Sequence, residues 1–151
     1  MDNCTNMRAL LCHCKSYESE ITGFSERPPG VQSETITQPT LHVEDAVVVL
    51  ITVETGDVPK VVAPRLVEEI EKMCRDTGHQ KVVLLPFAHL SACLADSETS
   101  IRLIDEVATL LADIAPARAH FGSDKRLSLD IYGHPGNVRY REFYGPDRDK
   151  G

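Results

Sequence analysis

Two short runs of aliphatic residues stand out along the chain, within Val47–Val53 and Lys81–Leu85. Each is a few residues long and rich in β-branched side chains, which is typical of strands buried on both faces. Arg8–His13 predicts a first strand, and Ser16–Gly23 contains a further candidate strand. Pro86 ends the second aliphatic run, because proline has no amide hydrogen to donate to a sheet ladder.

Two longer segments repeat apolar residues every three or four positions and therefore predict amphipathic helices. The first begins near Pro59 and runs to about Asp76, and the second runs over Glu98–Ile114, with Asp96 or Ser97 as its capping residue. The apolar stripes consist of Ala63, Leu66, Val67, Ile70, Met73 and Cys74, and of Ile101, Ile104, Val107, Ala108, Leu111 and Ile114.

The rest of the chain predicts short strands around these elements. Arg118–Phe121 and Arg126–Tyr132 predict a hairpin, Val138–Tyr144 a last strand, and Glu34–Thr37 a short edge strand. The fold class predicted from the whole pattern is mixed α/β, with one domain in which two long helices pack on one mixed sheet.

The corner after the second aliphatic run reads Pro86-Phe87-Ala88-His89-Leu90-Ser91. We interpret it as a strand that leads directly into the first turn of a helix. Such a corner presents backbone N–H groups and an imidazole at the carboxyl end of a strand, where α/β sheets often bind ligands. A capping histidine in a packed corner is the alternative interpretation.

Length and charge narrow the classes of protein that fit. A chain of 151 residues suits one domain, and its net charge of −7 is poorly suited to holding a nucleic-acid backbone unaided. The longest apolar run, Ala46–Ile51, is too short to span a membrane, and no signal-peptide pattern is present. We therefore expect a cytoplasmic protein without membrane association.

The cysteines indicate reduced thiols, because their number is odd and no secretory context accompanies them. In Cys12-His13-Cys14 only the two cysteines share a face of a strand, and no second ligand pair follows at zinc spacing. We expect no metal and, without a Walker loop or dinucleotide fingerprint, no cofactor. The five cysteines are Cys4, Cys12, Cys14, Cys74 and Cys93.

Four polar residues lie near predicted strand ends: His13, His89, Lys125 and His134. Each also has an ordinary structural interpretation, since Lys125 fits a solvated hairpin and His134 fits a residue that anchors a loop. Ser91 lacks the G-x-S-x-G setting of a nucleophilic serine. The residues alone therefore predict an α/β domain with a histidine-bearing corner and no defined reaction.

Taken together, several stretches resemble one family, the N-terminal editing domain of archaeal-type threonyl-tRNA synthetases. The resemblance implies a D-aminoacyl-tRNA deacylase-like fold over residues 7–144, after a flexible leader of residues 1–6 and before a linker that starts at residues 145–151. The matching stretches are Met7–His13, Val49–Glu54, Pro86–Ser91, Phe121-Gly122 with Lys125, and Gly133-His134-Pro135.

The resemblance implies proofreading, in which serine wrongly attached to threonine tRNA is hydrolysed and threonine is spared. One methyl group distinguishes the two amino acids and supplies only about 1–3 kcal/mol of discrimination, so the synthetic site accepts serine too often. A second site without room for that methyl group then removes the serine.

The resemblance also implies roles for particular residues. Lys125 and His89 correspond to the family's functional lysine and histidine, and water attacks the ester with help from the 2′-hydroxyl of the terminal adenosine. Lys125 and backbone N–H groups would position that water and stabilise the oxyanion, while His89 would shape the pocket or hold the ribose. The implied pocket consists of the backbone around Pro86, Phe87 and Ala88, with Val53 and Phe121 as walls; His13 and His134 are further candidates.

The implied partners are the aminoacylated 3′ end of tRNA(Thr), a second copy in a homodimer, and the catalytic and anticodon-binding domains of a synthetase in cis or in trans. Two alternatives remain at this stage: a D-aminoacyl-tRNA deacylase, and a non-catalytic dimerisation or amino-acid-binding module. Ser123 and Asp124 favour the module, because they stand where the family commonly has aromatic residues before the lysine.

Overall fold

The computed structural model describes residues 6–25, 33, 35 and 38–144. Residues 1–5 of the expected leader and residues 145–151 of the expected linker lie outside this part of the chain. Most of the edge strand predicted at Glu34–Thr37 lies outside it as well.

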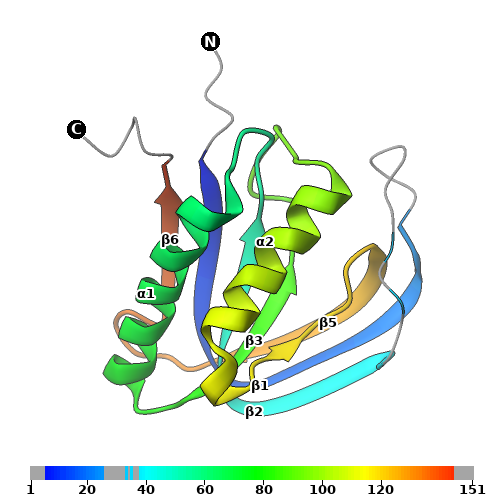
Figure 1. The fold of residues 1–151 in the computed structure, drawn as a ribbon. Helices are drawn as coiled ribbons and strands as arrows, with labels where there is room; N and C mark the ends of the chain where they lie inside the picture. Colours follow the sequence, from blue (N-terminus) through cyan, green and yellow to red (C-terminus); the bar gives the residue numbers. More distant parts are fainter. Residues whose placement is uncertain (1–5, 26–32, 34, 36–37, 145–151) are drawn as a thin grey trace.

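A six-stranded mixed sheet forms the centre of the domain, and two helices lie side by side on one of its faces (Figure 1). The strand order is β4-β3-β2-β1-β5, and β6 also pairs with β1. β1 and β2 are antiparallel, whereas β2, β3 and β4 run parallel. The strands are β1 (Met7–Phe24), β2 (Thr40–Thr52), β3 (Lys81–Pro86), β4 (Ala117–Arg118), β5 (Ser123–Ile131) and β6 (Val138–Phe143).

The helices are α1 (Pro59–Thr77) and α2 (Ser97–Leu110), and the short 3₁₀ helix η1 (Ala112–Ile114) follows α2. Asp96 caps α2 as expected, because its Oδ1 accepts a hydrogen bond of 2.7 Å from the Thr99 N–H. Gly78 ends α1 in the left-handed conformation, with φ at 77°. The predicted single mixed-sheet domain with two long helices is therefore confirmed.

The core lies between the sheet and the helices. Side chains of alternating β1 and β2 residues, among them Leu11, Val49 and Ile51, meet the apolar stripes of α1 and α2. The opposite face of the sheet carries a second buried cluster of Cys12, Cys14, Tyr17, Ala46, Val48, Leu50, Val83, Leu85 and Ala119. Cys12 and Cys14 share that face, and both thiols are free, as is Cys74. Cys93 is disulfide-bonded, so the expectation of reduced thiols is wrong for this residue.

The strand predictions are wrong in two places. The two strands predicted before residue 24 form one strand, β1, which is long enough to pair with β6 along its first half and β5 along its second. The hairpin predicted from Arg118 to Tyr132 does not form, because β4 extends the open edge of β3 while β5 pairs with β1. Between them Gly122 has φ of 91°, a conformation that suits glycine and redirects the chain.

The corner after β3 also differs from its prediction. Residues 87–96, here called the His89 loop, form no helical turn, and α2 begins only at Ser97. The end of β2 takes up the loop's backbone groups: Ala95 N–H donates to the Val53 carbonyl at 2.9 Å, and Thr55 N–H donates to the Cys93 carbonyl at 3.0 Å. These bonds replace those that a helical turn would have made.

The buried carboxylate of Glu54 joins the start of β1 to the His89 loop. Its side chain accepts hydrogen bonds from the Asn6 N–H at 2.8 Å, the Arg8 Nε at 3.0 Å and the Ser91 Oγ at 2.5 Å. Ser91 Oγ in turn accepts a bond of 2.9 Å from the Cys93 N–H. Because Glu54 is only 1% exposed, these donors compensate for the loss of solvation of its charge.

Asp57, three residues after Glu54, also fixes the start of β1 relative to the end of β2. Its carboxylate accepts hydrogen bonds from the N–H groups of Glu54 at 2.6 Å and Met7 at 3.1 Å. Burial nevertheless raises the pKa of Asp57 to about 6. Both acidic side chains therefore lie in the interior and accept hydrogen bonds from backbone N–H groups at the start of β1 and just after β2.

Three histidines gather at the other end of the sheet. His13 Nδ1 lies 2.7 Å from His134 Nε2, and the ring centroid of His13 lies 4.9 Å from that of His79. His134 Nδ1 lies 2.9 Å from the Pro135 carbonyl and must donate to it, so its Nε2 accepts from His13 Nδ1. His13 Nε2 is then an unprotonated nitrogen, buried and without a hydrogen-bond partner among the described residues. Tyr132 stacks against this cluster and donates to the Asp45 carboxylate.

No helix in the described part of the chain is both long and apolar enough to cross a membrane.

Replacing Ser91 by alanine should lower the free energy of unfolding by about 1–3 kcal/mol, because the buried Glu54 carboxylate loses one of its donors. Urea denaturation measures this change. Ser128→Ala is the matched control, because Ser128 is exposed on β5, and it should stay within about 0.5 kcal/mol of the parent. Equal stability of the two variants would contradict the role assigned to the bond between Ser91 and Glu54.

Acid should destabilise the fold through His13. Burial lowers the pKa of His13 below its ordinary value of 6.5, with the neighbouring His79 and His134 adding to the effect. The unfolded chain then binds a proton more readily, so this contribution to stability is present above pH 6.5 and is lost as the pH falls. Urea unfolding at pH 7.5 and 5.0 should show a larger loss for the parent than for His13→Gln. Equal losses would argue against this effect.

Candidate active site

A cavity of about 830 Å³ opens where the parallel strands β2 and β3 end. This volume lies within the range of about 300–1,000 Å³ that is usual for small-molecule sites. The His89 loop, the first turns of α2, the start of β5 and the end of β1 complete the wall. The lining residues used below are Ser25, Ile51, Val53, Leu85, Pro86, Phe87, Ala88, His89, Ser100, Ile104, Phe121, Ser123, Asp124 and Lys125.

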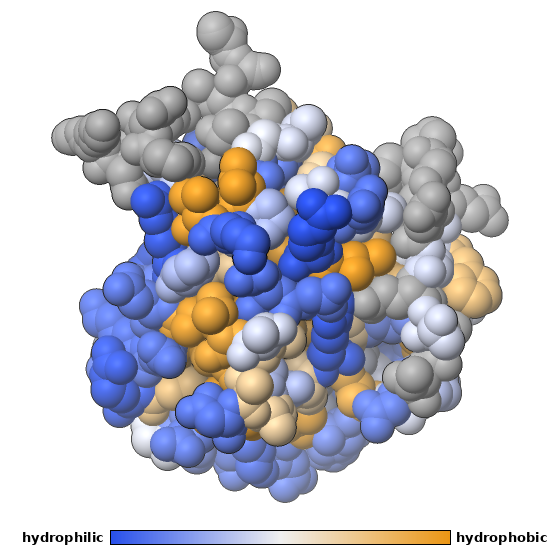
Figure 2. All heavy atoms as spheres, in the orientation of Figure 1, coloured by the Kyte–Doolittle hydropathy of each residue, from blue (hydrophilic) through white to orange (hydrophobic). Residues whose placement is uncertain are grey.

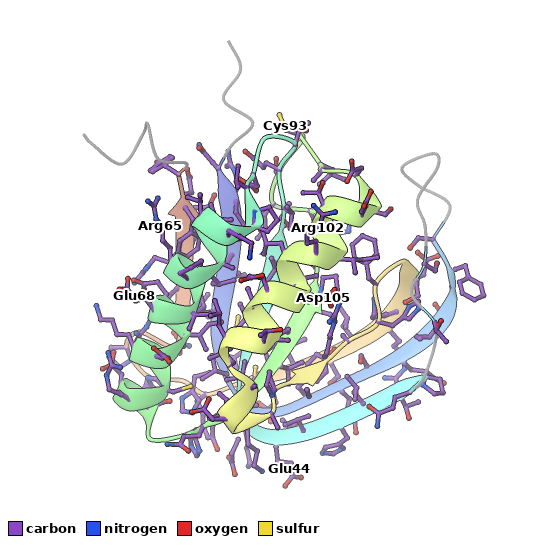
Figure 3. The ribbon with its side chains drawn as sticks, in the orientation of Figure 1. Glu44, Arg65, Glu68, Cys93, Arg102 and Asp105 are labelled. Atoms are coloured by element: carbon purple, nitrogen blue, oxygen red, sulfur yellow. The ribbon has the colours of Figure 1, made fainter. Side chains whose placement is uncertain are left out.

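Figure 3 helps to locate the two ends of the sheet. Cys93, in the His89 loop, lies at the end where β2 and β3 finish, and Glu44 of β2 lies at the opposite end. On the helix-covered face, Figure 2 shows hydrophilic atoms interrupted by apolar areas. Two charged residues of α2 are neutralised locally, since Arg102 pairs with Glu98 at 3.0 Å and Asp105 with Arg118 at 2.5 Å.

The structure brings together the residues expected to act in one site. Val53, Pro86, Phe87, Ala88, His89, Phe121 and Lys125 all line the cavity. They come from the residue after β2, the end of β3, the His89 loop, the segment before β5, and β5 itself. The two further candidates, His13 and His134, lie in the histidine cluster at the other end of the sheet and do not line the cavity.

Both backbone hydrogen-bonding groups of Phe87 are engaged within the protein. Its N–H donates to the Ile51 carbonyl at 2.9 Å, and its carbonyl accepts from the Thr52 hydroxyl. Pro86 has no N–H to offer. The Ala88 N–H, in contrast, makes no hydrogen bond to another described residue, and Ala88 is exposed. Ala88 is therefore the residue of this trio whose backbone donor stays available to a ligand.

His89 and Lys125 reach the cavity from different elements. The exposed His89 ring packs edge-on against Phe87, with ring centroids 5.0 Å apart and an interplanar angle of 76°. Lys125 is half-buried on β5, opposite Ile21 of β1, and its Nζ donates to the Ser123 carbonyl at 3.3 Å. The lysine is thus a cation in a cavity wall that combines apolar side chains with polar ones, the acidic Asp124 among them.

The two residues before Lys125 have contacts of their own. Ser123 Oγ lies 2.8 Å from Nδ1 of the buried His120, and Asp124 Oδ1 accepts a bond of 3.3 Å from Ser25 Oγ. Both residues therefore help to connect β5 with the end of β1 and the segment before β5. Both line the cavity next to Lys125, and neither has an aromatic side chain.

Sequence reasoning missed the contribution of α2 to the cavity. Ser100 and Ile104 line it, and the spacing of four residues places them on one helix face. The signal in the sequence was that Ser100 falls on the same helix face as Ile104 and Val107 of the apolar stripe. Ile51 and Leu85 were recognised only as strand residues, because periodicity does not show which buried residues border a cavity.

Comparison with known proteins identifies a family. Residues 7–143 match the family model described as the archaea-specific editing domain of threonyl-tRNA synthetase. The chain is 35% identical over 136 residues to a threonine–tRNA ligase of Thermofilum pendens, covering 85% of this chain and 21% of that protein. It is 31% identical over 150 residues to the enzyme of Cenarchaeum symbiosum, covering 96% of this chain and 23% of that protein.

A shorter relative is the threonine–tRNA ligase editing subunit of Saccharolobus solfataricus, 32% identical over 96 residues, with 63% of this chain and 25% of that protein covered. The chain thus spans only about a quarter or less of the length of these curated relatives.

Among solved structures, the c-Myc DNA unwinding element binding protein superposes with a TM-score of 0.62 at 12% identity, over 92% of this chain and 99% of that one. This likeness shows a shared fold and agrees with the expected D-aminoacyl-tRNA deacylase-like architecture. Since the family model covers nearly the whole described chain, the protein belongs to the family of archaea-specific editing domains of threonyl-tRNA synthetase.

Proposed function

We propose that this domain hydrolyses L-seryl-tRNA(Thr) and spares threonyl-tRNA(Thr). The observation that carries the proposal is the convergence of Lys125, His89 and the Ala88 backbone on one cavity, in a member of an editing-domain family. The cavity is large enough to accept an aminoacyl group together with part of the terminal nucleotide.

The proposed selectivity depends on the tightly packed inner wall. Ile51, Leu85 and Ile104 are each at most 2% exposed, so they have little freedom to move away from a larger ligand. The methyl group by which threonine exceeds serine would have to overlap such side chains or displace the ester from its reactive position. One methyl group is worth about 1–3 kcal/mol in such a pocket.

In the proposed reaction, water attacks the ester carbonyl with help from the 2′-hydroxyl of the terminal adenosine. The Lys125 ammonium and the Ala88 N–H act as fixed donors that position the water and stabilise the negative charge on the carbonyl oxygen. His89 stands at the exposed rim, where it would contact the ribose rather than the ester. This mechanism requires neither a metal nor a cofactor.

The net negative charge of the domain is consistent with a limited contact with RNA. At a net charge of −7 the domain would bind only the aminoacylated 3′ end, while catalytic and anticodon-binding domains of a synthetase hold the tRNA body, in cis or in trans. We further propose that the domain acts as a homodimer in the cytoplasm. A domain boundary at residues 7–144 agrees with the matched residues 7–143.

Deacylation of Ser-tRNA(Thr) should exceed that of Thr-tRNA(Thr) by about 10- to 200-fold in kcat/KM, because of the single methyl group. Parallel hydrolysis assays with both charged tRNAs measure this ratio. D-Ser-tRNA(Thr) is the informative third substrate. Faster loss of D-serine than of L-serine would favour a D-aminoacyl-tRNA deacylase and overturn the proposed substrate.

Lys125→Met should lower kcat for Ser-tRNA(Thr) by about 100- to 1,000-fold, the usual cost of removing one donor to a developing oxyanion. The control is Lys72→Met. Lys72 is an exposed lysine of α1 that does not line the cavity, so its replacement should leave kcat unchanged. Unchanged turnover of Lys125→Met would show that the mechanism is wrong. A parent protein that binds seryl-adenosine without hydrolysing the tRNA would favour the non-catalytic module.

A further inference from the structure

Five residues of the cavity wall are buried, and they define its inner end. They are Ile51, Val53, Leu85, Ser100 and Ile104, with exposed fractions between 1% and 7%. Four of these side chains are aliphatic and present no hydrogen-bonding group. Among the described residues, Ser100 carries the one polar side chain that is both buried and part of the cavity wall.

The Ser100 hydroxyl is not used by the fold in the described part of the chain. The Ser100 N–H makes the helical bond to the Asp96 carbonyl at 3.1 Å, but the hydroxyl makes no hydrogen bond to another described residue. A helical serine often satisfies its hydroxyl on the carbonyl four residues earlier, and Ser100 does not. Ser100 as a residue is only 7% exposed and lines the cavity, so its hydroxyl is available to a ligand that occupies the cavity.

Packing alone does not require a serine at this position. Ser100 lies on the buried face of α2 with Leu103, Ile104 and Val107, where alanine would serve the helix better and bury no polar group. The nearby Asp96 already caps the helix through the Thr99 N–H, so Ser100 has no capping role either. The hydroxyl is thus a polar group in an apolar environment without a structural task in the described residues.

We propose that the Ser100 hydroxyl recognises the side-chain hydroxyl of the aminoacyl group, and that it thereby distinguishes serine from small amino acids without a hydroxyl. This inference rests on the proposed function and adds a specificity residue to it. The aliphatic wall excludes larger side chains, while Ser100 offers both a donor and an acceptor to a hydroxyl that fits. A site built to bind a hydroxyl disfavours the analogue that lacks it, because its own polar group stays unpaired.

Binding of two stable analogues tests the inference directly: 3′-amino-3′-deoxyadenosine carrying amide-linked L-serine or L-alanine. Calorimetry with the 151-residue chain should give a lower Kd for the seryl compound, by about three- to ten-fold. In Ser100→Ala the seryl Kd should rise by that factor while the alanyl Kd changes less than two-fold. Thr109→Ala deletes an exposed hydroxyl at the other end of α2 and should keep the parental preference.

The outcomes separate the inference from the function on which it rests. A seryl preference that persists in Ser100→Ala overturns the inference, as does an equal weakening of both ligands, which a purely structural role would produce. Absence of any preference in the parent also overturns it but leaves the editing proposal in place. A parent that binds neither analogue overturns the proposed function itself.

Discussion

The end of β2 is the constraint on which the rest of the site depends. The second half of β2 is buried between the antiparallel β1 and the parallel β3, so its position has little freedom. Directly beyond it, Glu54 and Thr55 bind the His89 loop, and Val53 accepts the bond from Ala95. The apolar second half of β2 is thus followed by a polar segment whose hydrogen bonds hold the His89 loop beside the cavity.

Glu54 illustrates how stability and function are connected here. A buried carboxylate is costly unless its oxygens are hydrogen-bonded, and this one binds the start of β1 as well as Ser91. Loss of one donor would affect the fold first and the cavity wall second, because Val53 and His89 lie on either side of the contact. The geometry of the site is therefore maintained by residues that do not line it.

The histidines show how the sheet separates its two ends. His89 lies beyond the end of β3, whereas His13 and His134 meet near the start of β3, where His13 pairs with Val47 of β2. In the sequence all three are histidines close to strand ends, and the family resemblance offered His13 and His134 as further candidates. Only the strand directions and pairings determine which end each one occupies.

The cavity combines a half-buried cation, Lys125, with a buried aliphatic wall that carries the hydroxyl of Ser100. Lys125 comes from β5 and Ser100 from α2, and the two residues are 25 positions apart in the chain. This arrangement suits an ester whose aminoacyl group carries a small polar side chain. In the proposed site, α2 recognises that side chain, and β5 stabilises the negative charge on the carbonyl oxygen. The net negative charge of the domain leaves the tRNA body to other domains.

The sequence by itself determined the elements whose signals are local. The aliphatic runs predicted β2 and β3, and the three- and four-residue spacing predicted α1 and α2. Asp96, the cap of α2, was one of two residues expected in that role. The PFAHLS stretch with Lys125 and Val53 predicted which residues share a cavity, through a resemblance to a family. Tertiary structure decided what depends on long-range pairing: that β1 is one strand serving both β5 and β6, that residues 87–96 stay a loop, and that α2 contributes Ser100. These features are set by hydrogen bonds and packing between residues far apart in the chain, and no local pattern records them.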